Sequence, residues 1–175
     1  DSEDKNTIYR IKIPAGTYKA GSCFNVYSNT YIDMEGVTLV RTSNSAMFRL
    51  GRGEDVKNIS GYTGFKNITF HGGTIDGQGA QHSYKSTILR FAHASDVTIE
   101  NMTLTNTYSS HSIEFAAAQN VTINKFEYVP RSSGTSVNGI ITKYKLLYST
   151  TESGDDFKEL TSGEWDADKT VKTAT

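Results

Sequence analysis

The chain has 175 residues, a formal net charge of −1 and an aromatic content of 11%. This length allows one ordinary domain, or a medium-sized domain with part of a second. Its apolar and aromatic residues suffice for a buried core, which argues against a disordered chain. The near-neutral charge, without a run of Lys or Arg, predicts no nucleic-acid partner, and no stretch is long and apolar enough to predict a membrane span.

The first repeated element is Phe24–Val26, which recurs as Phe48–Leu50 after a shift of 24 residues. Both segments alternate apolar and polar side chains, which is the pattern of a short strand with one buried face. The same shift carries residues 89–99 onto residues 113–123, with apolar residues falling on apolar residues. A constant period of this size indicates a repeat architecture.

Two insertions interrupt the repeat between its early and late coils. The offset from Arg49 to Arg90 is 41 residues, and the extra residues divide into insertions that we place at residues 51–64 and 76–87. No segment has the 3.6-residue period and the length of a crossover helix, which argues against an α/β sheet. A coil of about 24 residues with three short strands instead stacks on its neighbours at roughly 4.8 Å. The sequence therefore predicts an all-β fold, a parallel β-helix of about five coils over residues 1–128.

Stacking of the coils aligns their equivalent residues in columns. Each large apolar side chain buried in such a column contributes about 1.5–3 kcal/mol to stability. In the outward column, Arg90 and Glu114 are expected to pair, and an exposed pair of this kind contributes less than about 1 kcal/mol. The expected inward column consists of Val26, Leu50, Phe91 and Phe115.

Asparagine and aspartate recur at the predicted corners of the coil. Asn67, Asp96 and Asn120 share one column at the entry to a strand, where these side chains tolerate left-handed backbone. Four Asn-x-Ser/Thr triplets, at Asn58, Asn67, Asn101 and Asn120, are alternatively glycan acceptors. We favour the turn role, because three of the four triplets coincide with repeat boundaries or bends.

Two motifs resemble a known β-helix family. Ile-Pro-Ala-Gly-Thr-Tyr at residues 13–18 is similar to the opening strand and turn of pectate-lyase-like proteins, which are right-handed parallel β-helices. Gly-Gly-Thr-Ile-Asp-Gly-Gln-Gly at residues 72–79 resembles an early rung of the polygalacturonases, glycoside hydrolase family 28. The resemblance covers about residues 8–128 and implies a right-handed coil. The motifs that carry that family's catalytic aspartates are absent from the repeat, so the resemblance implies no catalytic residue.

A second resemblance begins where the repeat ends. It implies a fragment of a β-sandwich over residues 129–175, in which Arg131 and Asn138 hydrogen-bond a sugar; turn residues without a ligand are the alternative for both. Because the repeat also continues through Phe126 and Tyr128, we interpret the chain as a hybrid or composite of two modules. The segments that look like a discoidin-like (F5/8 type C) carbohydrate-binding module of family 32 are residues 126–131, 138–144, 147–149 and 163–165.

Candidate chemistry lies at the insertions, where loops vary without disturbing the repeat. A glycosidase requires two carboxylates roughly 5–10 Å apart, and Asp76 with Asp55 or Glu114 provides the candidate catalytic pair. Asp76 is alternatively a turn former within Ile-Asp-Gly-Gln-Gly. His93 and His111 lack the spacing of metal ligands, so we expect no metal and no cofactor.

These observations together predict an extracellular carbohydrate-recognising β-helix module, part of a larger polysaccharide-acting protein that is secreted or held at the cell surface. The expected partner is a polysaccharide or another glycan. Two alternatives remain open at this stage. One is a glycoside hydrolase or polysaccharide lyase with a divergent active site, and the other is a structural or adhesin-type surface β-helix.

Overall fold

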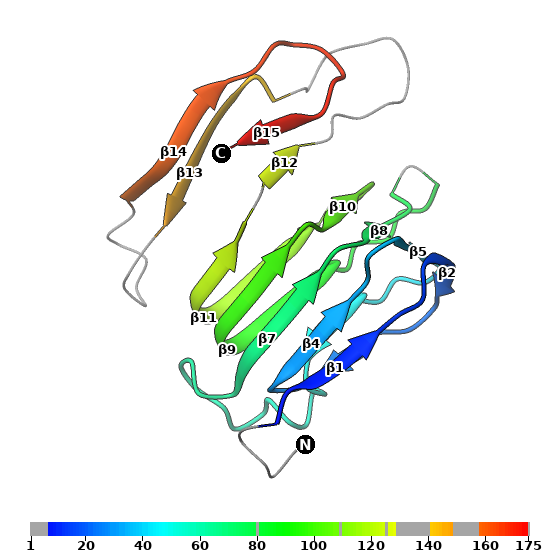
Figure 1. Cartoon of the computed structure of the whole chain (residues 1–175), viewed down its shortest axis with the longest axis vertical. Helices are drawn as coiled ribbons and strands as arrows, with labels where there is room; N and C mark the ends of the chain where they lie inside the picture. The colour runs from blue at the N-terminus through cyan, green and yellow to red at the C-terminus, as the bar shows by residue number, and fades with distance from the viewer. Residues whose placement is uncertain are drawn as a thin grey trace. The chain divides into compact units, whose positions relative to one another are not determined.

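The structure, a computed structural model, describes residues 7–79, 81–108, 110–124, 126–128, 141–148 and 158–174. Throughout these residues the regular structure consists of β-strands, without a helix (Figure 1). The described chain therefore contains no helix of the length and apolar character that a membrane crossing requires. The chain divides into two compact units, Asp1–Asn124 and Lys125–Thr175.

The first unit consists of parallel strands in two curled sheets (Figure 1). The seven-stranded sheet contains β1 (Tyr9–Lys12), β3 (Phe24–Val26), β4 (Thr30–Asp33), β6 (Phe48–Leu50), β7 (Phe65–His71), β9 (Leu89–Glu100) and β11 (Ile113–Ile123). Their spatial order is β1-β4-β7-β9-β6-β3, with β11 paired to β9. The four-stranded sheet contains β2 (Gly16–Ala20), β5 (Val37–Arg41), β8 (Thr74–Asp76) and β10 (Thr103–Thr105), in the order β10-β8-β5-β2. The predicted all-β class is confirmed.

β9 and β11 are long strands that turn corners. Each contains two non-glycine residues with positive φ, His93 (55°) and Asp96 (56°) in β9, and Ala117 (54°) and Asn120 (51°) in β11. Left-handed backbone at these points redirects the chain, which a straight strand could not do. The start of β9 therefore pairs with β6, and its end pairs with β7.

The pairing of strands has the predicted 24-residue register. Phe115 lies opposite Phe91, and β3 pairs with β6 with the same shift. Arg49 lies opposite Arg90, which confirms the larger offset between the early and late coils.

Both insertions lie between strands of the repeat. Residues 51–64 separate β6 from β7, as predicted. The second insertion, predicted from residue 76, begins after Asp76, which is the last residue of β8, and extends to the start of β9. Neither insertion therefore disturbs the ladder of paired strands.

The side chains enclosed by the two sheets form the core. Val26, Leu50 and Phe91 are 5%, 4% and 0% exposed, which confirms the inward column for these three residues. The expectation of an interior Phe115 is wrong, because this residue is 37% exposed. Its ring still stacks on that of Phe91, with centroids 5.3 Å apart. The physical reason is position, since β11 pairs only with β9 and ends the sheet.

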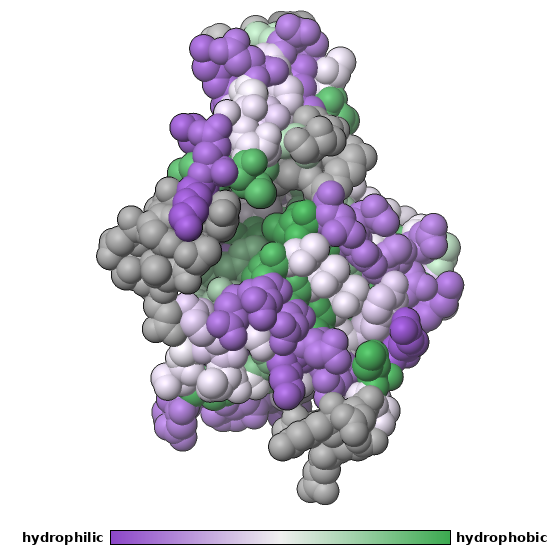
Figure 2. Space-filling view, turned by 60° about the vertical axis from the view of Figure 1, so that its left-hand side comes forward, coloured by the Kyte–Doolittle hydropathy of each residue, from purple (hydrophilic) through white to green (hydrophobic). Residues whose placement is uncertain are grey.

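Apolar surface is also exposed at the other end of the stack. Ile11 on β1 is 49% exposed, and Ile123 on β11 is 42% exposed. Both strands have a paired neighbour on one side only. The face of the molecule shown in Figure 2 is mainly hydrophilic, with smaller areas of hydrophobic surface between the polar residues.

The outward column carries the expected ion pair. Arg90 Nε lies 3.4 Å from Glu114 Oε1, and the two side chains are 54% and 33% exposed, so the predicted pairing is confirmed. In the earlier coils, Arg49 Nε donates a hydrogen bond of 2.8 Å to Asn25 Oδ1. The column is therefore held by polar contacts between successive coils.

The turn role of the asparagine column is also confirmed. Asn67, Asp96 and Asn120 all have left-handed backbone, with φ of 57°, 56° and 51°. Asn67 Nδ2 donates to Asn29 Oδ1 at 3.1 Å, and Asn120 Nδ2 donates to Asp96 Oδ1 at 3.0 Å. These amides link the corners of neighbouring coils.

The second unit contains two antiparallel strand pairs. β12 (Phe126–Tyr128) pairs with β15 (Lys172–Ala174), and β13 (Lys143–Tyr148) pairs with β14 (Lys158–Glu164). The rings of Tyr144 and Trp165 stack with centroids 4.1 Å apart. The expectation that residues 126 and 128 continue the repeat is wrong, because β12 pairs antiparallel with β15 instead of aligning with β10.

Candidate functional site

The insertion at residues 51–64 folds back over the edge of the core. Val56 and Ile59 are partly buried against the core residues of the first unit. Gly51 begins the insertion with φ of 59°, and a Cβ at this position would lie 2.5 Å from the Phe65 ring. Only glycine fits both the left-handed backbone and the close approach. The insertion is therefore held against the corner between β3 and β4.

Asp55 and Tyr27 form the polar contact at this corner. Tyr27 Oη donates to Asp55 Oδ2 at 2.9 Å, and the backbone N–H of Arg52 donates to the same oxygen at 2.7 Å. The Arg52 N–H, followed by the Tyr27 hydroxyl, lowers the pKa of Asp55 below its usual value. The same hydrogen bond raises the pKa of Tyr27. At neutral pH this corner therefore presents an ionised carboxylate beside a neutral phenol.

Two adjoining hollows open on either side of Tyr27 and Ser28. The larger has a volume of about 400 Å³ and is lined by β1, β3 and the start of β4. This volume falls within the range of about 300–1,000 Å³ that is typical of ligand pockets. The smaller hollow, of about 210 Å³, lies against the insertion and is lined by Tyr27, Ser28, Asp55, Ile59, Gly64 and Phe65.

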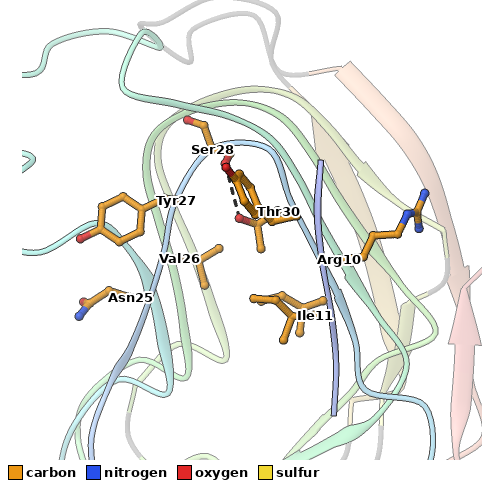
Figure 3. A pocket seen from close by; sticks show the side chains of 9 residues that line it. Arg10, Ile11, Asn25, Val26, Tyr27, Ser28 and Thr30 are labelled. Carbon is orange, nitrogen blue, oxygen red and sulfur yellow. Dashed lines mark hydrogen bonds between the residues drawn. The ribbon is translucent and has the colours of Figure 1, made fainter. Parts of the chain in front are cut away.

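The larger hollow has an apolar floor. Ile11, Val26 and Thr30 face the same interior space in Figure 3. Asn25 and Tyr27 point away from it on one side, toward solvent and the neighbouring insertion. The polar groups of this region therefore gather at the rim shared with the smaller hollow, which we name the Tyr27–Asp55 cleft.

The Tyr27–Asp55 cleft offers chemistry suited to a neutral polar ligand. An ionised carboxylate accepts two or more hydrogen bonds, and Ser28 adds a hydroxyl. The Tyr27 ring lies edge-on to Phe65, with centroids 6.2 Å apart, so its position is fixed by packing. An aromatic ring next to hydrogen-bonding groups binds molecules that have both C–H faces and hydroxyls.

The two candidate catalytic carboxylates have separate structural partners. Asp76 accepts hydrogen bonds from the Gln78 backbone N–H at 2.9 Å and from Asn106 Nδ2 at 2.8 Å. Glu114 contacts Arg90 and accepts a hydrogen bond of 3.3 Å from the Thr87 hydroxyl. Asp76 lies on β8 in the four-stranded sheet and Glu114 on β11 in the seven-stranded sheet. These contacts favour the turn role of Asp76.

The second insertion is anchored by a buried arginine. Arg41 is 1% exposed, and its guanidinium donates to the backbone oxygens of Ser43 and Ser86, each at 2.9 Å. It also lies 5.2 Å from the centroid of the Tyr84 ring. Burial lowers the pKa of Arg41. This residue therefore pins the insertion to β5, a role that the sequence did not indicate.

The other predicted positions divide into two groups. His93 has left-handed backbone and its Nδ1 lies 2.9 Å from the Gly61 backbone oxygen, so it joins a corner of the coil to the first insertion. Arg131 and Asn138, the predicted sugar-binding residues, lie outside the residues that the structure describes.

Sequence reasoning missed two sets of residues that the fold assembles. Tyr27 and Ser28 line both hollows, although they lie in a stretch between strands that shows no motif. Asp33, Glu35 and His71 form a second cluster, in which the ligand atoms all lie within 4.8 Å of one another. The signal for this cluster is the register of β4 and β7, because Asp33 lies opposite His71.

Comparisons with protein-family models, curated proteins and solved structures find no match to this chain. The functional argument therefore depends on the geometry of the clefts and clusters described above.

Proposed function

We propose that the chain is an extracellular carbohydrate-recognising module, and that the Tyr27–Asp55 cleft holds the glycan. The observation that carries this proposal is a fixed aromatic ring whose hydroxyl is bound to an ionised carboxylate at the rim of an apolar hollow. A sugar presents apolar C–H faces and hydroxyls that both donate and accept hydrogen bonds. Asp55, Ser28 and the Tyr27 hydroxyl match these hydroxyls, and the apolar floor matches the C–H face.

The same proposal includes the finer architecture. We infer that the first unit is a right-handed parallel β-helix. The support is the parallel register between successive coils, together with the right-handedness of about 98% of parallel strand connections. The two antiparallel strand pairs of the second unit support a β-sandwich fragment. A secreted or surface-attached polysaccharide-acting protein is the setting that suits such a pair of modules.

Glycan binding by the full chain tests the proposed site. A glycan array selects the ligand, and calorimetry then compares the wild type with Tyr27→Phe and Asp55→Ala. A lost neutral hydrogen bond costs about 0.5–1.5 kcal/mol, so Tyr27→Phe should weaken binding roughly 2- to 12-fold. Asp55→Ala should weaken it further, because a charged acceptor is removed. Tyr18→Phe is the matched control, since Tyr18 donates to the Pro14 backbone oxygen on the other sheet.

The experiment also separates the two predicted sugar sites. If Arg131→Ala and Asn138→Ala abolish binding while Tyr27→Phe and Asp55→Ala leave it unchanged, the ligand belongs to the discoidin-like segment and the cleft proposal is wrong. Absence of binding to any glycan on the array would favour the structural or adhesin-type alternative.

A further inference from the structure

Two turns stack directly on each other beyond the ends of β4 and β7. The Met34 backbone N–H donates to the His71 oxygen at 2.8 Å, and Gly72 N–H donates to the Glu100 oxygen at 2.9 Å. Gly72 has φ of +70°, and a Cβ there would lie 3.0 Å from the Glu35 backbone. This close approach brings the turn after β4 down onto the turn after β7.

The stacked turns gather three metal-binding side chains. Asp33, Glu35 and His71 each offer a ligand atom, and these atoms all lie within 4.8 Å of one another. Asp33 and His71 are half-buried and Glu35 is exposed, so the cluster opens to solvent on one side. Ligands at about 2.0–2.1 Å from a tetrahedral ion lie roughly 3.3 Å apart. The exposed Glu35 side chain is free to supply the remaining movement.

A fourth carboxylate fixes the imidazole of His71. Glu100, opposite His71 in the neighbouring strand, places Oε1 3.0 Å from His71 Nδ1. A carboxylate only accepts hydrogen bonds, so Nδ1 carries the hydrogen and Nε2 keeps its lone pair. This is the form of histidine that binds divalent metals, with a carboxylate orienting the ring from behind. Glu100 is itself held by Asn124 Nδ2 at 3.1 Å.

The charges around the cluster favour a cation. Asp33, Glu35 and Glu100 are acidic, and the basic neighbour is Lys12, whose Nζ lies 3.3 Å from Asp33 Oδ2. The Lys12 side chain is 75% exposed, so an incoming metal ion can displace it into solvent. In the absence of metal, Lys12 serves as the counter-ion of Asp33.

We propose that Asp33, Glu35 and His71 form a site for one divalent transition-metal ion, with Zn²⁺ as the best-fitting ion and Glu100 as the positioning residue of His71. The imidazole ligand selects against Ca²⁺ and Mg²⁺, which prefer all-oxygen sites. One nitrogen and two carboxylates leave the fourth tetrahedral position to water. Because Asp33 and His71 lie on successive coils, the bound ion links the coils together.

Titration of the metal-free full chain with ZnCl₂, followed by calorimetry, tests the proposal. We expect one Zn²⁺ per chain, at least tenfold weaker binding in His71→Ala and Asp33→Asn, and about 10- to 100-fold weaker binding in Glu100→Gln. His82→Ala is the matched control, because His82 lies in the second insertion and stacks on Tyr84. Its affinity should equal that of the wild type.

Lys12→Gln provides a readout that a purely structural role would not move. Removal of the competing ammonium group should strengthen Zn²⁺ binding several-fold while leaving the folded state intact. Zn²⁺ should also raise the melting temperature of the wild type but not of His71→Ala, since a ligand that binds only the folded state stabilises it.

Three results would overturn the inference. They are the absence of saturable Zn²⁺ binding, an affinity that His71→Ala does not change, and Ca²⁺ binding that equals Zn²⁺ binding. Circular dichroism of each variant before titration ensures that lost binding does not reflect lost folding. The Tyr27–Asp55 cleft shares no lining residue with the cluster, so this test and the glycan test can fail independently.

Discussion

Individual residues with left-handed backbone determine where the coil turns. Most of these positions hold Asn, Asp or Gly, which tolerate positive φ at low cost. His93 and Ala117 are exceptions, because neither side chain has this tolerance. At His93 the hydrogen bond with the Gly61 backbone oxygen offsets part of the cost. No such contact is available to the Ala117 side chain, since it is a methyl group.

Ala117→Gly should therefore stabilise the protein. Alanine in the left-handed region costs about 1–2 kcal/mol, and glycine removes that cost at the expense of a more flexible unfolded chain. We expect a net gain of roughly 0.5–1 kcal/mol in the free energy of unfolding, measured by chemical denaturation. Ala116→Gly, at the preceding strand position, is the control and should destabilise. Destabilisation by Ala117→Gly would show that the backbone at this corner is not left-handed.

At the scale of elements, the insertions are the variable parts of the coil. Their positions follow from offsets in the repeat, because apolar residues must return to the same column after each loop. Their internal structure does not follow from the repeat. The contact of Asp55 with Tyr27 joins residues on different strands of the coil, and no local pattern in either segment indicates it.

The 51–64 insertion should loosen at acid pH. The pKa of Asp55 is lower in the folded chain than in the unfolded chain, chiefly because of the Arg52 N–H and then the Tyr27 hydroxyl. Its contribution is therefore fully present above the unfolded pKa of about 3.9 and is lost as the pH falls through the folded value. Amide hydrogen exchange across the insertion should show this loss of protection.

The matched variant for this prediction is Asp55→Asn, which keeps the shape of the side chain but does not titrate. Its insertion should exchange at a rate that depends on pH only through the chemistry of exchange. If wild type and variant lose protection in parallel on acidification, another group controls the insertion.

At the scale of the whole molecule, the sequence predicts the first unit well and the second less well. The 24-residue shift identifies the strand partners, the corner residues and the Arg90–Glu114 pair, because stacking turns a period in sequence into contacts in space. The end of the stack could not be predicted in this way. Residues 126 and 128 fit the apolar pattern of the repeat, yet β12 pairs with β15, a partner distant in sequence.

The functional clusters show the same limit. Asp33, Glu35 and His71 have no spacing that resembles a metal motif, and they meet because two turns stack. Once the register of β4 against β7 is known, their proximity follows. The register is therefore the claim from which the cleft, the corners and the proposed metal site all derive.

The most direct test of this register is solution NMR of the full chain. Parallel stacking places Leu89 beside Ile113 and Phe91 beside Phe115, with strands about 4.8 Å apart. We predict nuclear Overhauser contacts between the backbone protons of β9 and β11 at a constant separation of 24 residues along both strands. Contacts whose sequence separation changes steadily along the strands, as in an antiparallel pair, or the absence of contacts between β9 and β11, would contradict the account.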